Sequence, residues 1–299
     1  MTALRDIWLI AGFEIRRAIR SWRALALLVL YGVASGGATL LFTRFVGMLE
    51  NTLADELNVA PTETPGTMLA QLVTSELWHR TVRHLVGSDH LADVLVTAPP
   101  LAVFGLWFGF LVVPFFAASA SAECVAIDVS TRAIRYEAQR TGRLELVLGR
   151  FVGQLGLNAV ATLAASAVVW VVAMTCMYGV QPVDLAVWLL AFAPRAWTFG
   201  LPFTALGTAA SQLTASSAWA RVLALGGTAG SWVVFGLVTS ARREPWTTVA
   251  DVVGPVLPQS WLQGLWEPGF GWLVSAAACA GLAAVALSVG YVRFSARDL

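Results

Sequence analysis

The sequence predicts an all-α integral membrane protein with six transmembrane helices. Hydrophobic residues make up 58% of the 299 residues and charged residues only 12%, about half the charged fraction usual in a soluble domain. Six apolar stretches are long enough to cross a bilayer as helices, which takes roughly 20 residues each. Arginines gather on alternate flanks of these stretches. The whole chain, 1–299, is therefore expected to form one transmembrane domain.

The predicted spans follow the apolar stretches in chain order. They cover residues 24–43, 101–122, 151–177, 185–210, 222–239 and 271–292. Pro114 is tolerable inside the second span, because neighbouring groups can satisfy the backbone of a membrane helix at a proline. The fourth span is interrupted by Pro194, Arg195 and Pro202.

Arginine placement predicts that both termini face the cytoplasm. Five arginines precede the first span, and five more lie in the loop 123–150. Short loops rich in Lys and Arg stay on the cytoplasmic side. The segment 44–98 instead holds seven acidic residues against three arginines, which suits an outer loop. The expected location is the bacterial inner membrane.

Residues 4–22 are predicted to form an amphipathic helix before the first span. The apolar residues at helical spacing are Leu4, Ile7, Trp8, Ala11, Ile15, Ile19 and Trp22. A basic face, an apolar face and two Trp suit a helix in the lipid headgroup layer. The arginines expected to anchor it there are Arg5, Arg16, Arg17 and Arg20.

Two outer segments are expected to contain short helices. Within 44–98, apolar residues after Pro65 and Gly66 predict one amphipathic helix. Residues 244–270 combine several Trp and Pro with Val and Leu. This segment is too apolar for a free loop and too broken for a spanning helix. Re-entrant helices that dip into the outer leaflet would satisfy both facts.

Composition excludes several kinds of chemistry. All 19 basic residues are Arg, so the chain has neither a P-loop lysine nor a lysine for Schiff-base chemistry. The cysteines lack the spacing of a redox or metal site and are interpreted as small buried hydrophobic residues. The histidines lack the spacing of a metal site and are interpreted as solvated residues of the outer loop. These residues are Cys124, Cys176, Cys279, His79, His84 and His90.

Arg195 is the one ionisable residue clearly inside a predicted span. A charged side chain at mid-membrane costs roughly 2.5–3.5 kcal/mol on insertion scales, so it usually faces a cavity or a partner. Two interpretations stay open. Arg195 contacts an anionic substrate or a gating element, or its side chain extends to the outer headgroups.

The loop 123–150 carries the strongest local pattern. It mixes charges of both signs with Ile134, Tyr136 and three leucines. A charged tether would not need these hydrophobic residues, so the loop is interpreted as a docking surface held under the membrane. The alternative is a solvated loop that only sets the orientation.

At this loop the sequence resembles a known family. Residues 128–151 run DVSTRAIRYEAQRTGRLELVLGRF, which is similar to the cytoplasmic coupling segment of bacterial ATP-binding-cassette (ABC) exporter permeases of the second type. The matching positions are Asp128, Ala133, Ile134, Arg140, Arg143, Leu148, Gly149 and Arg150. The family pattern has Pro where this chain has Thr141, and Lys where it has Arg150. The N-terminal FEIRRAIRSWRALALLVLY resembles the family's elbow helix, and the closing FSARDL resembles its basic tail.

The resemblance implies a permease subunit that forms an export pathway with a second copy or a close relative. It also implies separate ATPase subunits that bind ATP and Mg, so no cofactor, metal or catalytic residue is assigned to this chain. The expected ATPase contacts are Asp128, Tyr136, Glu137, Arg140, Arg143 and Glu145. Membrane lipids are expected partners, and nucleic acid is not.

Other functional classes remain as alternatives. An ATP-independent carrier should show pseudo-symmetric halves and charges near mid-membrane, neither of which is obvious. A scaffold subunit of a larger membrane complex would also fit six spans. A membrane-embedded enzyme would need carboxylates or His inside the spans, and the predicted spans hold neither. Sparse charge in the spans favours an apolar or amphiphilic cargo.

Overall fold

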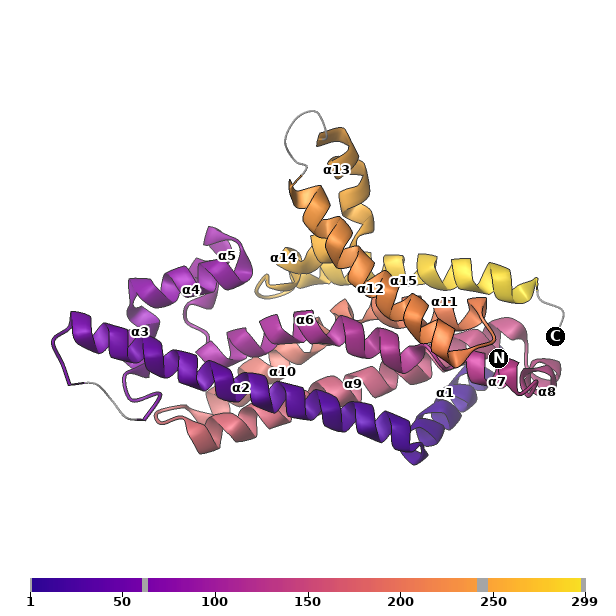
Figure 1. Ribbon diagram of the computed structural model, residues 1–299, viewed down its shortest axis with the longest axis horizontal. Coiled ribbons are helices and arrows are strands. Elements are labelled where there is room, and N and C mark those ends of the chain that lie inside the picture. Colours follow the sequence, from indigo (N-terminus) through magenta and orange to yellow (C-terminus); the bar gives the residue numbers. More distant parts are fainter. Residues whose placement is uncertain (1, 61–63, 241–246, 297–299) are drawn as a thin grey trace.

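The computed structural model describes residues 2–60, 64–240 and 247–296. Within these residues every regular element is a helix, which confirms the predicted all-α class. Six segments of the described chain are long and apolar enough to cross a membrane, as predicted. Figure 1 shows most of them running lengthwise, side by side.

The spanning segments are separated by short connections or small helices. Their helices are α2 (Trp22–Glu56), α6 (Pro100–Ser121), α9 (Arg143–Cys176), α10 (Pro182–Phe199), α11 (Leu201–Leu213), α12 (Ser217–Ser240) and α15 (Trp272–Ser295). Together α10 and α11 form one span, with a break at Gly200. Pro202 lies in the first turn of α11, where its missing N–H costs least.

Two spanning helices extend furthest beyond the predicted apolar stretches. α2 continues past residue 43 to Glu56, and α9 begins at Arg143 instead of residue 151. On the extension of α2, Val46, Glu50 and Ala54 are all buried. Packing against the protein therefore carries the helix past the end of the apolar sequence.

One end of the molecule carries three short or amphipathic helices. α1 (Thr2–Arg20), α7 (Ala126–Ser130) and α8 (Ile134–Arg140) lie there with the last turn of α15 (Figure 1). Ser21 separates α1 from α2 and caps α2 by accepting a hydrogen bond from the backbone N–H of Ala24 at 3.3 Å. The helix predicted over 4–22 is thus a separate element that packs along α9.

The opposite end carries α3 (Leu69–Thr74), α4 (Glu76–Val86) and α5 (Asp89–Leu95) (Figure 1). The prediction of one amphipathic helix here is wrong, because Ser75 ends α3 and caps α4. The Ser75 hydroxyl accepts a hydrogen bond from the Trp78 backbone N–H at 3.2 Å. Glu50 ties this region to α2, since its carboxylate accepts the N–H groups of Gly66 and Met68 at 2.8 and 3.1 Å.

Short helices precede the last span, as the Trp- and Pro-rich segment predicts. They are α13 (Thr247–Val253), η1 (Gly254–Val256), η2 (Pro258–Trp261) and α14 (Leu262–Leu265). In Figure 1, α12 leans away from the other spans and carries α13 outward. Three parts of the predicted segments, 61–63, 244–246 and the tail 297–299, lie outside the described residues.

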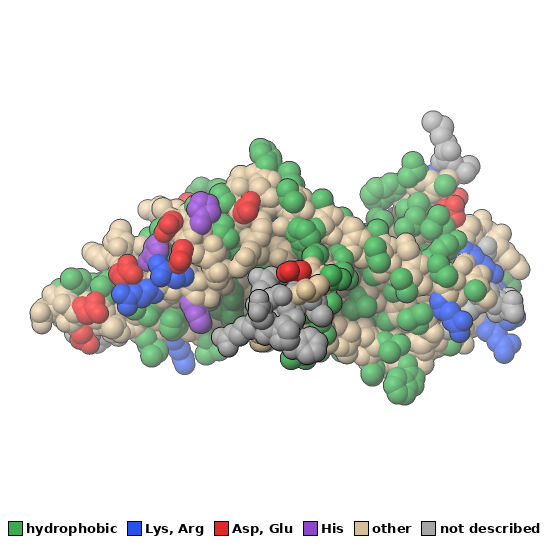
Figure 2. Space-filling view, turned by 90° about the horizontal axis from the view of Figure 1, so that it is seen from above, with side chains coloured by type: hydrophobic (Ala, Val, Ile, Leu, Met, Phe, Trp, Pro, Cys, Tyr) green, Lys and Arg blue, Asp and Glu red, His purple; other side chains and the backbone are tan. Residues whose placement is uncertain are grey.

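The main core lies around α6, which contacts α2, α9, α10, α11 and α12. It is built from aliphatic and aromatic side chains such as Leu106, Phe110, Phe199 and Phe203. Figure 2 shows most charged side chains gathered toward the two ends of the visible face, with mainly uncharged surface between them. This distribution suits a protein whose middle lies in hydrocarbon.

Candidate functional site

Four helices meet at the end of the molecule where α1 lies. They are α1, α7, α8 and the first turns of α9, and a small apolar cluster holds them together with the end of α15. Its buried members are Cys124, Val125, Ile134, Leu146, Val147 and Phe294. The charged residues of the segment 123–150, which the sequence analysis treated as a loop, lie around this apolar cluster.

Asp128 lies inside this unit, only 6% exposed. Both of its carboxylate oxygens accept hydrogen bonds from Arg17 of α1, at 2.9 and 3.1 Å. Its Oδ2 also forms an ion pair with Arg150 of α9. Two-point arginine–carboxylate contacts fix geometry as well as charge. Asp128 therefore joins α1, α7 and α9, and it does not face an external partner.

Arg150 is the centre of an ionic network that also contains Arg17, Asp128 and Glu137. The sequence places Arg150 at the family's Lys position before the third span, but it does not predict these partners. Its side chain is 3% exposed. It pairs with Asp128 and with Glu137 of α8, and it donates to the backbone carbonyl of Cys124. A buried arginine with several acceptors holds its neighbours in one arrangement, because losing any partner leaves buried charge.

A second buried contact between α1 and α9 lies one helical turn after Arg150. Glu14 of α1, 6% exposed, accepts a hydrogen bond from the Nε2 of Gln154 in α9 at 2.9 Å. Burial raises the pKa of Glu14 above its ordinary value, while the nearby Arg150 and Arg17 partly oppose the shift. Neither Glu14 nor Gln154 was singled out from the sequence.

The spacing of Gly149, Arg150, Gly153 and Gln154 in the sequence is a pattern from which this contact between α1 and α9 could be predicted. Arg150 and Gln154 are four apart, as are Gly149 and Gly153, so they follow one side of α9. A Cβ added at Gly149 would lie 2.6 Å from the Cβ of Ile10 on α1. The two glycines let α1 approach α9 closely, which brings the polar groups of both helices together.

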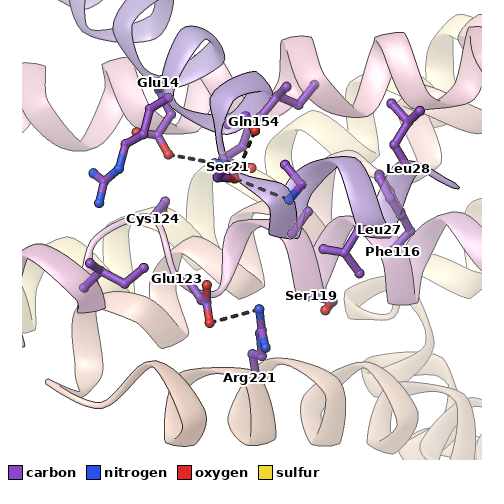
Figure 3. A pocket seen from close by; sticks show the side chains of 16 residues that line it. Glu14, Ser21, Leu27, Leu28, Phe116, Ser119, Glu123, Cys124, Gln154 and Arg221 are labelled. Atoms are coloured by element: carbon purple, nitrogen blue, oxygen red, sulfur yellow. Dashed lines mark hydrogen bonds and ion pairs between the residues drawn. The ribbon is translucent and has the colours of Figure 1, made fainter. Parts of the chain in front are cut away.

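A cavity of about 330 Å³ adjoins this network (Figure 3). Glu14, Arg17 and Gln154 contribute to one wall. Across the cavity, Glu123 at the end of α6 forms an ion pair with Arg221 in the first turns of α12, at 2.9 Å. The cavity is thus bordered by polar groups from α1, α9, α12 and the segment before α7.

The remaining predicted coupling residues differ in exposure and in their contacts. Tyr136 is 74% exposed and Arg140 is also exposed, so α8 presents both outward. Arg143 instead donates to the Ser295 carbonyl at the end of α15, at 2.6 Å. Glu145 lies in the first turn of α9 and its carboxylate folds back over Gly142. Only Tyr136 and Arg140 are freely exposed surface residues among these four.

The predicted anchoring arginines of α1 also differ in position. Arg5, Arg16 and Arg20 are exposed. Arg17 is half-buried, and its hydrogen bonds to Asp128 raise the pKa of its guanidinium. Arg17 therefore bonds to another part of the chain, whereas Arg5, Arg16 and Arg20 lie at the surface and their predicted role in anchoring stays a prediction.

A direct contact links α7 to the centre of the fold. Ser211 near the end of α11 is fully buried. Its hydroxyl accepts the backbone N–H groups of Val125 and Ala126 at 2.8 Å each. The start of α7 is thereby bonded to α11, which packs against α6 and α15. A displacement of α7 would therefore act directly on α11 through these hydrogen bonds.

Arg195 lies farther along the fourth span and is 7% exposed. Its Nη1 donates to the backbone carbonyl of Trp266, which follows α14, at 3.4 Å, and its guanidinium lies 5.2 Å from the ring centroid of Phe192. No acidic partner is recorded for it within the described chain, and its Nε has no hydrogen-bond acceptor there. The side chain thus contacts the short helices before α15 and does not extend to solvent.

His79, His84 and His90 do not form a metal-binding cluster with one another or with other described residues. His79 pairs with Asp93 at 3.1 Å. Among the described residues, no three His, Cys, Asp or Glu side chains are grouped to hold a metal ion. The candidate functional features of the described chain are therefore the ionic network, the cavities and Arg195.

Comparison with protein families decides the class. The sequence matches the family described as ABC-2 family transporter protein over residues 8–299. The chain belongs to the ABC-2 transporter family. A comparison with curated proteins finds no match. As an ABC-2 permease, the chain is a multi-pass membrane subunit of an ABC transporter, and its family implies an ATP-binding partner subunit.

Proposed function

We propose that this ABC-2 permease forms an export pathway across the bacterial inner membrane and is driven by a separate ATPase subunit. The observation that best supports this proposal is the ionic network of Arg17, Asp128, Glu137 and Arg150. It joins α1, α7, α8 and α9 at the end of the molecule where α1 lies. A unit held by buried ion pairs moves as one body, so force applied to α8 reaches the spans.

The cytoplasmic assignment of this end rests on arginine density. Ten arginines lie in α1, α7–α8 and their flanks. The opposite end, with α3, α4 and α5, carries most of the acidic residues of the segment 44–98. Both termini are then cytoplasmic, and α8 faces the compartment that contains ATP.

The proposed mechanism begins at the exposed face of α8. ATP binding closes the ATPase dimer, which presses on Tyr136 and Arg140. The network passes this displacement to α1 and α9, and Ser211 passes it to α11. The spans then rock as rigid bodies and open the pathway outward.

A second copy of the chain, or a close relative, completes the pathway in this proposal. α12 supports it, because Gly226 and Gly230 are four residues apart and have nothing within 4 Å of their Cβ positions. Such a surface allows close approach of another helix in a membrane. α12 also leans away from the other spans (Figure 1).

The test is purification of the tagged chain from its native membrane in mild detergent. We expect a stoichiometric ATPase subunit and vanadate-sensitive ATP hydrolysis in the same fraction. A clean preparation without an ATPase, repeated at low salt and with an ATP analogue present, would overturn the proposal. Such a result would favour an ATP-independent carrier or a scaffold subunit.

A further inference from the structure

A second cavity, of about 400 Å³, lies toward the opposite end of the molecule. It is enclosed by the end of α4, the first half of α6, the second half of α12 and the segment from η2 to Trp266. Its aromatic walls are Trp107, Phe110, Trp232, Phe235 and Trp266. This size and lining are typical of sites for small apolar ligands.

Two polar groups at this cavity are unpaired. Gln259 is 1% exposed, and its Nε2 donates to the Ser231 hydroxyl at 2.7 Å. Its carbonyl Oε1 has no donor among the described residues, and the indole Nε1 of Trp232 has no acceptor there. A buried polar group without a partner costs about 1–3 kcal/mol. A ligand hydroxyl or amide would supply the hydrogen-bond donor that the Oε1 of Gln259 lacks.

The lining also defines the charge of the ligand. No Asp, Glu, Arg or His belongs to the described residues that line this cavity. Moving a charged ligand from water into such a site would carry a large uncompensated desolvation cost. The described lining therefore suits an uncharged ligand.

A larger apolar cavity between α2, α4 and α6 is a weaker candidate. It has about 740 Å³, with Arg80 and His84 at its margin. Arg80 already pairs with Glu76 at 3.2 Å, and no unpaired buried polar atom is recorded for any residue that lines it within the described chain. Nothing there selects a ligand over lipid.

We propose that the cavity at Gln259 binds an uncharged amphiphile with an apolar body and one hydroxyl or amide group. The hydroxyl or amide donates to the Oε1 of Gln259, and the aromatic walls contact the apolar body. Identifying this amphiphile with the transported cargo rests on the proposed export function, whereas binding itself does not.

The test is photolabelling of the purified chain in nanodiscs with a diazirine derivative of dodecanol. Mass spectrometry should locate adducts on 232–239 and 259–266, and unlabelled dodecanol should suppress them. The matched control is the same diazirine on dodecanoate, which differs at the headgroup and carries a charge. We expect weaker labelling of these two segments by the anion.

Three variants sharpen the test. Gln259→Leu should lower dodecanol labelling at the site about fivefold, which corresponds to one hydrogen bond of about 1 kcal/mol. Ser231→Ala should retain the labelling, because it leaves the Oε1 of Gln259 in place. Leu262→Trp should block labelling by filling the cavity, and it decides the matter if Gln259→Leu does not fold.

The proposal is overturned if adducts spread along lipid-facing residues, or if alcohol and anion label these segments equally. It is also overturned if a folded Gln259→Leu variant labels like the native protein. Stimulation of ATP hydrolysis by dodecanol in the purified complex tests the export function separately. Site labelling without stimulation would leave the binding site standing and remove its assignment to cargo.

Discussion

Arg17 of α1 and Asp128 of α7 form a two-point ion pair across 111 positions of sequence, at 2.9 and 3.1 Å. Arg150 contacts the same carboxylate from α9. One carboxylate thus balances two arginines, and Glu137 supplies the second negative charge. The arrangement makes α1, α7, α8 and α9 depend on one another.

Replacing the shared carboxylate should therefore be costly. We expect Asp128→Asn to lower the free energy of unfolding by about 3 kcal/mol, because it removes the carboxylate that balances both Arg17 and the buried Arg150 and leaves Glu137 as the one remaining acidic partner of Arg150 in the network. The measurement is denaturation by sodium dodecyl sulfate in mixed micelles. Asp89→Asn, which breaks an exposed pair with Arg83, is the control and should cost under about 1 kcal/mol. Equal costs for the two variants would contradict the structural role of Asp128.

The glycine contact between α1 and α9 can be tested with a matched pair. In Gly153→Ala, the new Cβ would lie 2.8 Å from the Cβ of Glu14, so α1 must move away from α9. Gly281→Ala in α15 places the same methyl group in open space. We expect faster protease cleavage between α1 and α2 in Gly153→Ala only. Similar cleavage rates in both variants would refute the close contact.

Glu14 predicts a pH dependence of stability. Its folded-state pKa is raised above the ordinary value of 4.5, so the folded protein binds this proton more tightly than the unfolded chain. The stabilisation is complete below pH 4.5 and is lost as the pH rises through the raised pKa. Glu14→Gln should flatten this part of the profile of melting temperature against pH. Parallel profiles for native protein and variant would exclude Glu14 as the titrating group.

Replacement by Met should change the free energy of unfolding in opposite directions at Arg195 and at Arg221. Arg195→Met should raise the free energy of unfolding by about 1–2 kcal/mol, part of the insertion cost of an uncompensated charge. Arg221→Met should lower it, because it breaks the ion pair with Glu123. ATP hydrolysis by the complex should fall in Arg195→Met if the residue is a gating contact. Destabilisation by Arg195→Met would contradict this expectation, because it would mean that the contacts of Arg195 with the Trp266 carbonyl and the Phe192 ring outweigh the cost of its charge.

The surface of α8 provides the test of coupling. Arg140→Glu should reduce retention of the ATPase subunit in pull-down experiments while leaving the melting temperature unchanged, because Arg140 is exposed. Arg143→Glu should lower the melting temperature, since Arg143 bonds the end of α15. Arg80→Glu, an exposed reversal at the other end, controls for net charge. Normal ATPase retention by Arg140→Glu would mean that α8 is not the docking surface.

Local pattern was sufficient for much of this molecule. Hydrophobic stretches identified the six spans, and the mixture of charges and hydrophobic residues in 123–150 identified the segment that contains Asp128 and Glu137. The helix ends were less predictable. α2 continues to Glu56 because tertiary packing buries Val46 and Glu50 beyond the apolar stretch.

The sequence by itself determined the all-α membrane class, the six spans and the end at which arginines gather, because hydrophobicity and charge density are local properties. Only the tertiary structure decided that Arg150 pairs with Asp128 and Glu137, that Gln154 meets Glu14, and that Gln259 borders a cavity. These contacts join helices far apart in sequence. Their partners depend on how closely α1 approaches α9 and how α12 leans from α6, which are properties of packing and not of any one segment.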